Sequence, residues 1–532
     1  MSVGICIRQY LFRHKAQTAC AALLITAAVG AALVPPQLLR VIVDSILENG
    51  REDQLLVFAL LYTGSYLLVG LLGLCKEALL VCVSQGISKE IRISMLRHIN
   101  RLTYQNFTRY DSASLEAYFN NDVLAIDRLI TSGVVSISID LFKMIGILFL
   151  IFLFSRTFGL IVLAFLPLLA WLALIIRRRM FNAQIKARSL EGTVNHLVYE
   201  NVENMEAVKL YDQGHSSRKY KNVLEEHFTA VQTSVFYDAI FPPIMEIIKD
   251  LVIAALLLLS GFRGNLLGMS VGAVVSTISL VTDLFTPVEN LGMELQTIQK
   301  SMAGLARVNQ FFALAEDEER TQHMEHTEEN LELRFEHVFF SYENGEEVIT
   351  DFNFSLQGTD KVTLQGRSGA GKSTLMKLAY GLLKPTAGRV MVNGLDTCLL
   401  SDESRAKLFG IVYQEPFFSG GTIYEELSMH RDIAEEQVRE ALALVGLQRI
   451  GDLHRRFSAS DYSTGELSLL NIARVILSDC RILFLDEMNA RIDPATAELI
   501  MKIMNRAAAD KMVLSINHYG NLLEDSSVLK LG

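Results

Sequence analysis

Residues 366–374 read GRSGAGKST, a glycine-rich segment that ends in lysine, serine and threonine. The apolar run KVTLQ precedes it, and the helical pattern TLMKLAYGLL begins at its last residue. A loop of this type between a strand and a helix binds phosphate through its backbone N–H groups. We expect Lys372 to reach the β- and γ-phosphates of a nucleotide and the Ser373 hydroxyl to bind Mg²⁺. The predicted nucleotide-binding residues of this loop are Gly366, Arg367, Ser368, Gly369, Ala370, Gly371, Lys372, Ser373 and Thr374.

A second segment, ILFLDE at residues 482–487, has the features of a buried parallel strand that ends in two carboxylates. Asp486 is a candidate ligand of Mg²⁺, and Glu487 is placed to polarise an attacking water. The pattern is weak alone, but here Asp486 follows Lys372 by 114 residues in the same predicted domain. Together the two motifs predict the binding and hydrolysis of ATP, with Mg²⁺ as the cofactor.

The composition separates a membrane part from a water-soluble part. The chain has 532 residues, enough for at least two domains, and half of them are hydrophobic. The apolar residues crowd into the part before residue 314, whereas the rest resembles an ordinary soluble domain. A net charge of −10 disfavours nucleic acid as a partner. The six cysteines show no paired metal spacing, so we expect free thiols.

Six apolar runs are long enough to cross a membrane, since a spanning helix needs about 20 residues. They lie near residues 18–46, 55–80, 131–154, 158–176, 244–262 and 268–290. Lys and Arg crowd into the connections on one side of these runs, which places the N-terminus and the soluble domain in the cytoplasm of a cell-membrane protein. A soluble protein with buried helices is the alternative, and the charge asymmetry argues against it.

The long connections keep helical periodicity but become polar, as expected for membrane helices that continue into water. We expect them to be joined by short crosspieces near residues 111–120 and 211–220. A charged linker follows before the soluble domain begins at LRFEHVFFSY. The predicted domains are a transmembrane domain at 1–313, a linker at 314–331 and an ATP-binding domain at 332–532.

With these motifs in this order, the chain resembles a half-transporter of the ATP-binding cassette (ABC) exporter family over nearly its whole length. The resemblance implies an all-α transmembrane domain of six helices, followed by an α/β P-loop NTPase domain. Tyr342 in HVFFSY matches the aromatic residue that stacks on adenine, and Gln414 in VYQEPF matches the glutamine that contacts Mg²⁺. Asp493 in MNARID matches an aspartate at the dimer interface, and His518 in LSINHYG matches the switch histidine that contacts the γ-phosphate.

The segment YSTGE, residues 462–466, stands where the family has the signature LSGGQ, which caps the ATP bound to the other subunit. Ser463 and Gly465 match the signature residues that grip the γ-phosphate. Thr464 replaces a glycine and adds a Cβ where the backbone must approach phosphate. Glu466 replaces a glutamine, and a carboxylate about 8 Å from a phosphate would cost about 2 kcal/mol at an effective dielectric constant of about 20.

The surroundings of YSTGE depart from the family as well. Leu467 and Leu469 stand where arginines are usual, and the preceding segment RRFSASD is shorter than its counterpart. The sequence ends at VLKLG, where the family continues with a further strand and helix, so we expect that packing to be missing. Because the sequence shows no peptidase domain before the first predicted membrane helix, we expect no leader-peptide cleavage by this chain.

An intact phosphate loop beside an altered signature predicts an asymmetric transporter. We expect ATP-driven export by a heterodimer, in which a second ABC half-transporter lends its intact signature to the ATP held by Lys372, Glu487 and His518. One alternative is a homodimeric exporter of drugs, lipids or peptides. The other is an ATP-binding regulatory half with little turnover.

Several charged residues fall inside the predicted membrane spans, where charges are costly and usually functional. They are Asp140, Lys143, Glu246, Lys249, Asp250 and Asp283. They either line a path for a charged cargo, such as a peptide or a thiol compound, or form ion pairs that face a water-filled cavity. We favour the ion pairs. The expected partners are therefore a second half-transporter, membrane lipid and an unknown small molecule or peptide as cargo.

Overall fold

The computed structural model describes residues 2–47, 52–110, 112–212, 214–261, 269–324, 331–342, 345, 347–486, 494–517 and 523–531. The chain divides into two compact units. The first comprises Met1–Arg101 with Tyr110–Leu314, and the second comprises Leu102–Arg109 with Ala315–Gly532. A helical unit is thus followed by a unit with sheets, as the predicted fold class requires.

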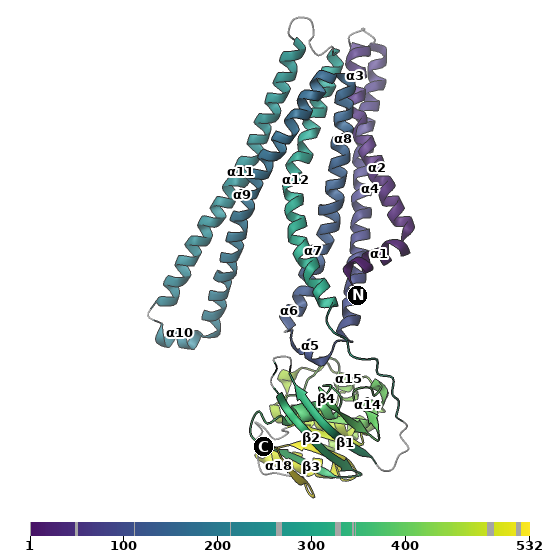
Figure 1. Cartoon of the computed structure of the whole chain (residues 1–532), viewed down its shortest axis with the longest axis vertical. Coiled ribbons are helices and arrows are strands. Elements are labelled where there is room, and N and C mark those ends of the chain that lie inside the picture. The colour runs from purple at the N-terminus through teal and green to yellow at the C-terminus, as the bar shows by residue number, and fades with distance from the viewer. Residues whose placement is uncertain are drawn as a thin grey trace. The chain divides into compact units, whose positions relative to one another are not determined.

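The first unit consists of long helices and short π-helical turns (Figure 1). Its elements are α1 Val3–Arg13, α2 Lys15–Ala32, α3 Val34–Val41, η1 Ile42–Leu47, α4 Glu52–Ile99, α6 Ser112–Ala117, η2 Tyr118–Asp122, α7 Val123–Arg128, η3 Leu129–Val135, α8 Ser136–Phe154, α9 Arg156–Glu203, α10 Met205–Tyr211, α11 His215–Gly261 and α12 Val271–Phe312.

Among the described residues, five helical stretches are long and apolar enough to cross a membrane. They are Lys15–Leu47, Gln54–Ile99, Ser114–Phe154, Arg156–Glu203 and Val271–Phe312. The first four contain one predicted run each, and Val271–Phe312 contains all but the first three residues of the run 268–290. The remaining run, 244–262, lies in α11 as far as Gly261, and Glu246, Lys249 and Asp250 interrupt its apolar pattern; residue 262 lies outside the described residues.

The core of the first unit lies where α8, α9, α11 and α12 meet. Ile151, Phe158, Met245 and Leu280, one from each helix, are completely buried there. The helices α9 and α11 lie side by side and are joined by α10 (Figure 1). This packing places the polar extensions of two predicted spans next to each other.

Both predicted crosspieces lie earlier in the chain than expected. Residues 111–120 fall on α6 and η2, whereas the short helix that follows α4 is α5, Tyr104–Thr108, which groups with the second unit. The Thr103 side chain caps α5 by accepting a hydrogen bond from Asn106 N–H at 3.3 Å. The second crosspiece is α10, because α9 ends at Glu203, and α11 has already begun at His215.

The second unit is built on two sheets. Its strands are β1 Glu332–Ser341, β2 Glu347–Gln357, β3 Lys361–Gln365, β4 Ala387–Val392, β5 Leu395–Asp396, β6 Phe409–Val412, β7 Ile482–Asp486, β8 Met512–Ile516 and β9 Ser527–Lys530. Its helices, besides α5, are α13 Lys372–Ala379, α14 Asp402–Leu408, α15 Ile423–Ser428, α16 Glu435–Leu444, η4 Ala459–Asp461, α17 Thr464–Ile476 and α18 Pro494–Ala507.

The strand order explains how the motifs come together. One sheet is antiparallel in the order β2-β1-β4-β5, and the other has the order β6-β7-β8-β3-β9 with parallel neighbours. In the parallel sheet, β8 lies between β7 and β3. Because parallel strands end at the same edge, the loops that follow β3, β7 and β8 leave the sheet side by side.

The predicted linker 314–331 is partly fastened to the second unit. The Arg320 guanidinium forms an ion pair with Asp402 at 2.6 Å, and the Lys384 ammonium forms one with Glu318 at 2.6 Å. The backbone N–H of Gln322 donates to Leu399 O at 3.0 Å. The described part of the linker therefore contributes to the surface of the ATP-binding unit.

Candidate nucleotide-binding site

The phosphate loop, residues 366–374, connects the end of β3 to the start of α13. Gly369 and Gly371 have φ values of +86° and +82°, which favour glycine. A Cβ on Gly371 would lie 2.6 Å from Ile349 Cδ1, whereas the Cβ direction of Gly369 is open. The loop therefore bends sharply and presents free space above Gly369, a shape that fits a phosphate group at the N-terminus of α13.

Lys372 is 6% exposed, and its ammonium lies over the loop. Its Nζ donates to the carbonyls of Gly366 and Arg367, both at 2.9 Å. The neighbouring Ser373 is exposed, as are Arg367 and Ser368. The positive charge of Lys372 thus lies at the loop, where it would stabilise the negative phosphate oxygens of a bound nucleotide.

Tyr342 lies beside this loop and comes from the end of β1. Its hydroxyl oxygen is 3.1 Å from Thr374 Oγ1. Its ring packs edge-on against Phe340, with ring centroids 4.9 Å apart. The structure thus brings Tyr342, the predicted adenine-stacking residue, into contact with the predicted phosphate loop.

Asp486 is the last residue of β7, and it pairs with Ile516 of β8. Two strand spacings, about 10 Å, separate β7 from β3. The carboxylate and the phosphate loop therefore share one edge of the sheet. Glu487, Asp493 and His518 lie outside the described residues. In the sequence, Glu487 directly follows Asp486, and His518 directly follows Asn517.

The YSTGE segment forms the start of α17. Ser463 is the N-cap residue: its Oγ accepts from Glu466 N–H at 3.3 Å, and Glu466 Oε2 accepts from Ser463 N–H at 2.9 Å. This reciprocal pattern is a capping box. Thr464 is exposed at the first helical position, while Gly465 is buried. The threonine side chain thus lies on the surface at the helix N-terminus.

The Glu466 carboxylate has further partners. It forms an ion pair with Arg449 and accepts a hydrogen bond from the Ser463 hydroxyl at 3.0 Å. The Ser463 backbone N–H, its hydroxyl and the Arg449 guanidinium lower the pKa of this carboxyl. Its negative charge is therefore compensated locally, which reduces the repulsion of a phosphate expected from the sequence.

Two other departures from the family have structural roles. Leu469 is 6% exposed inside the core beneath α17, and Leu467 packs against the same core. The short RRFSASD segment is held by an aromatic stack, in which Phe457 lies between Phe418 and Tyr462 at centroid distances of 4.5 and 5.2 Å. Where the family usually has arginines, Leu467 and Leu469 thus contribute to the apolar core.

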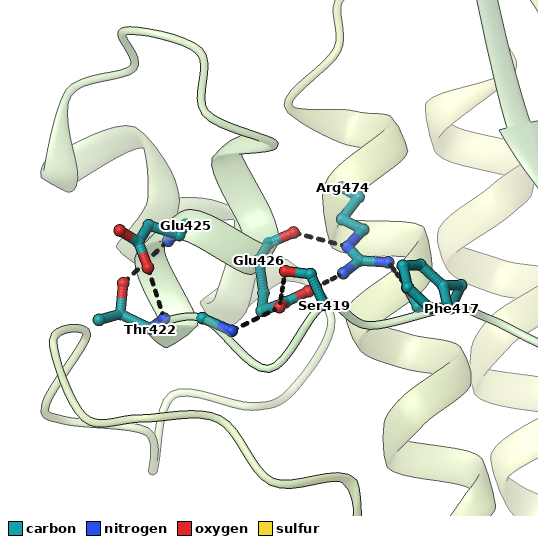
Figure 2. A network of polar contacts seen from close by, with 7 residues as sticks. Phe417, Ser419, Thr422, Glu425, Glu426 and Arg474 are labelled. Carbon is teal, nitrogen blue, oxygen red and sulfur yellow. Dashed lines mark hydrogen bonds and ion pairs between the residues drawn. The ribbon is translucent and has the colours of Figure 1, made fainter. Parts of the chain in front are cut away.

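A buried network that the sequence motifs did not reveal holds the loop that contains Gln414, through the backbone of Phe417. Arg474 of α17 forms an ion pair with Glu426 of α15, and both residues are less than 10% exposed. Figure 2 shows the guanidinium between Glu426 and the backbone of Phe417. A lone arginine in the apolar pattern NIARVI was the available signal, since a buried charge needs a partner.

The charged residues in the membrane spans are partly paired within the first unit. Lys249 and Glu246 form an ion pair on one face of α11. Asn290 Nδ2 donates to Asp140 Oδ2 at 3.3 Å, which links α12 to α8. The first contact is an i,i+3 ion pair, and the second is a hydrogen bond from a neutral amide, so the ion-pair interpretation stays a prediction for Asp140.

Comparisons with known proteins agree on one family. Residues 18–288 match the model of the ABC transporter transmembrane region, and residues 349–490 match a model described as ABC transporter. The putative ABC transporter ATP-binding protein exp8 of Streptococcus pneumoniae is 28% identical, over 92% of this chain and 85% of its own length. The ATP-dependent lipid A-core flippase of Syntrophus aciditrophicus is 23% identical, over 85% of this chain and 77% of its own length.

Among solved structures, a bacterial Atm1-family ABC exporter with ATP bound superposes with a TM-score of 0.77 at 20% identity. The match covers 97% of this chain and 93% of that one. At this identity the likeness shows a shared fold, which extends through both units.

Proposed function

The chain belongs to the ABC transporter family, with the membrane region and the ATP-binding cassette in one polypeptide, and we propose that it is one half of an asymmetric heterodimeric exporter. It is an ATP-hydrolysing transporter with an exporter fold. In the proposal, the ATP held by this chain is hydrolysed with the partner's signature. The ATP held by the partner meets YSTGE and turns over slowly.

The observation that carries the asymmetry is the contrast between two helix N-termini. At α13, Gly369 leaves the approach to the phosphate loop open. At α17, the exposed side chain of Thr464 stands directly after Ser463, where the partner's γ-phosphate would have to approach. A helix N-terminus binds an anion through close backbone N–H groups, so an added Cβ and methyl weaken the second site.

We assign the following roles at the first site. Lys372 binds the β- and γ-phosphates, Glu487 polarises the attacking water, and His518 contacts the γ-phosphate. Ser373, Gln414 and Asp486 would hold Mg²⁺, which supplies positive charge to the transferring phosphoryl group. Tyr342 would stack on adenine, and Ser463 with Gly465 would contact the partner's nucleotide.

A homodimer is the second candidate, and one observation favours it. The capping box at Ser463 and the Arg449–Glu466 ion pair give α17 an ordered start and compensate the extra carboxylate. The YSTGE segment therefore still provides an ordered helix N-terminus for a phosphate. In a homodimer, ATP would then be hydrolysed at two equal sites.

For the topology and the cargo, we propose a cell-membrane location with the N-terminus and the cassette in the cytoplasm. The Lys- and Arg-rich connections support this orientation. The charged residues of α8, α11 and α12 suit a charged or zwitterionic small molecule or peptide better than a purely apolar cargo.

The test is the ATPase activity of the purified chain alone, compared with the chain co-expressed with a half-transporter that carries LSGGQ. Each sample is also prepared with Glu487→Gln. The proposal predicts a nearly inactive chain, and an active pair that Glu487→Gln inactivates. Brisk hydrolysis by the chain alone would establish the homodimer instead.

A further inference from the structure

The helix α17 holds the loop that contains Gln414 on both sides of that residue. Asn471 Nδ2 donates to Tyr413 O at 3.5 Å, one residue before Gln414. Arg474 Nη1 donates to Phe417 O at 2.5 Å, three residues after it. Residues three apart lie on one face of a helix. A single face of α17 therefore contacts the backbone before and after Gln414.

The contact on the far side of Gln414 is reinforced by Glu426. Arg474 Nε donates to Glu426 O at 2.6 Å, and the two side chains form an ion pair. The Glu426 carboxylate also accepts from Gly421 N–H at 3.0 Å and from the Ser419 hydroxyl at 2.5 Å. In Figure 2 the bonds from Ser419, Gly421 and one Arg474 nitrogen meet at the Glu426 carboxylate, whereas the bond from Arg474 Nε ends on the Glu426 backbone carbonyl.

The network is shielded from water. Arg474, Asn471 and Glu426 are 8%, 4% and 3% exposed. The Phe418 ring covers the guanidinium, with Cζ 4.1 Å from the ring centroid. Burial alone would raise the pKa of the Glu426 carboxyl, but hydrogen bonds from Ser419 and Gly421, with the Arg474 charge, lower it below its ordinary value.

The buried network ties the movement of the Gln414 loop to the movement of α17. A buried arginine that loses its carboxylate is strongly destabilised, so separation of the loop from α17 is unfavourable. The helix runs from Thr464 to Ile476 without an internal proline or glycine after Gly465, so its two ends move together. Its N-terminus carries Ser463 and Gly465, and its other half holds the Gln414 loop.

We propose that Arg474, Asn471 and Glu426 are positioning residues that transmit the position of the Gln414 loop to the signature. They couple the ATP site built on this chain's phosphate loop to the site that its signature completes on the partner. This inference rests on the proposed function, because it takes Gln414 and the YSTGE segment as parts of two shared ATP sites.

The experiment compares hydrogen exchange with and without Mg-ATP in the full-length chain carrying Glu487→Gln, which retains ATP. Thr464→Glu is added, so that its carboxylate repels a second nucleotide from the signature. We expect ATP to slow exchange in residues 413–421 and, through α17, in residues 464–467 by at least about threefold. Arg474→Lys keeps a charge for Glu426 but removes the guanidinium fork, so the response at 464–467 should disappear while that at 413–421 remains.

Arg455→Lys is the matched control, because Arg455 forms an exposed ion pair with Asp461 close to the signature. Ser419→Ala and Asn471→Ala, which remove one hydrogen bond each, replace Arg474→Lys if that variant does not fold. The ATP-dependent difference is the readout, since a purely structural defect changes both states equally. An unchanged response at 464–467 in these variants, or no response at 413–421 in the parent, would overturn the inference. Loss of ATPase activity on Glu487→Gln in the pair with an LSGGQ-bearing half-transporter tests the proposed function separately.

Discussion

The backbone N–H of Ser463 donates to the Glu466 carboxylate at 2.9 Å, while the Ser463 hydroxyl accepts from the Glu466 N–H at 3.3 Å. The residue that replaces the family's glutamine is therefore part of the helix cap. Its second carboxylate oxygen pairs with Arg449. The unfavourable step in the signature is accordingly assigned to Thr464 rather than to Glu466.

Glu466→Ala should loosen the start of α17. The substitution removes the reciprocal half of the capping box, a loss of about 1 kcal/mol. This corresponds to about fivefold faster hydrogen exchange in residues 464–467. Glu436→Ala on the exposed start of α16 serves as the control. Equal exchange in Glu466→Ala and the unmodified chain would mean that the cap does not hold this turn.

The Glu466 contribution should depend on pH. The pKa of this carboxyl is lowered in the folded protein, so its stabilising effect is complete above the ordinary value of about 4.3. The effect is lost as the pH falls through the folded-state pKa. The ion pair with Arg449 is partly exposed, so its share is about 0.5 kcal/mol.

The measurement for this prediction is the ratio of exchange rates at 464–467 between Glu466→Gln and the unmodified chain, taken at each pH. Comparing two proteins at one pH cancels the intrinsic pH dependence of exchange. The ratio should be about two at pH 7 and approach one as the pH falls through the lowered pKa of the Glu466 carboxyl. A ratio that grows on acidification would contradict the prediction that Glu466 stabilises the helix start less at low pH.

Tyr342 should act through its ring more than through its hydroxyl. Tyr342→Phe removes only the contact with Thr374, so the KM for ATP should rise less than about threefold. Tyr342→Ala removes the stacking surface and should raise the KM about tenfold with little change in kcat. Tyr424→Phe, which loses a hydrogen bond to Ile433 O, is the control. A Tyr342→Ala protein with an unchanged KM would remove Tyr342 from the adenine site.

The Glu246–Lys249 ion pair offers a test of the intramembrane charges. If the pair is structural, Glu246→Lys alone should lower the thermal midpoint of the membrane unit by about 3 °C. The exchanged pair, Glu246→Lys with Lys249→Glu, should restore it. If the exchanged pair regains stability but loses cargo-stimulated ATPase activity, these charges contact the cargo as well.

Local patterns in the sequence were sufficient to predict the fold class and the strand–loop–helix arrangement around residues 366–374. Apolar runs of spanning length and the spacing from Lys372 to Asp486 are properties of the chain alone. By contrast, the position of α5 depends on capping by Thr103 and on packing with the second unit, so periodicity misplaced that crosspiece. The second crosspiece, α10, was misplaced because the helical pattern continues through its ends.

The charges that surround the YSTGE segment could not be predicted from the sequence either, because they come from residues that only the tertiary structure brings close. From the sequence alone the Glu466 carboxylate has no evident partner, whereas in the structure Arg449, seventeen residues earlier, compensates its charge. Arg474 and Glu426 are separated by 48 residues, and the sequence around either residue does not identify the other as its partner. Contacts of this kind depend on how α15 and α17 pack, which motif spacing does not encode.

The most direct test of the asymmetry is Thr464→Gly, which restores the small residue at the first position of α17. In the chain purified alone, we predict that this substitution raises the ATPase rate by about tenfold, because the backbone N–H groups regain close access to phosphate. Thr496→Gly, a threonine of α18 outside the signature, is the control. In the pair with an LSGGQ-bearing partner, Thr464→Gly should activate the slow site while the Glu487-dependent site is unchanged. A Thr464→Gly chain that hydrolyses ATP no faster than the unmodified chain would contradict the assignment of Thr464 as the cause of the asymmetry.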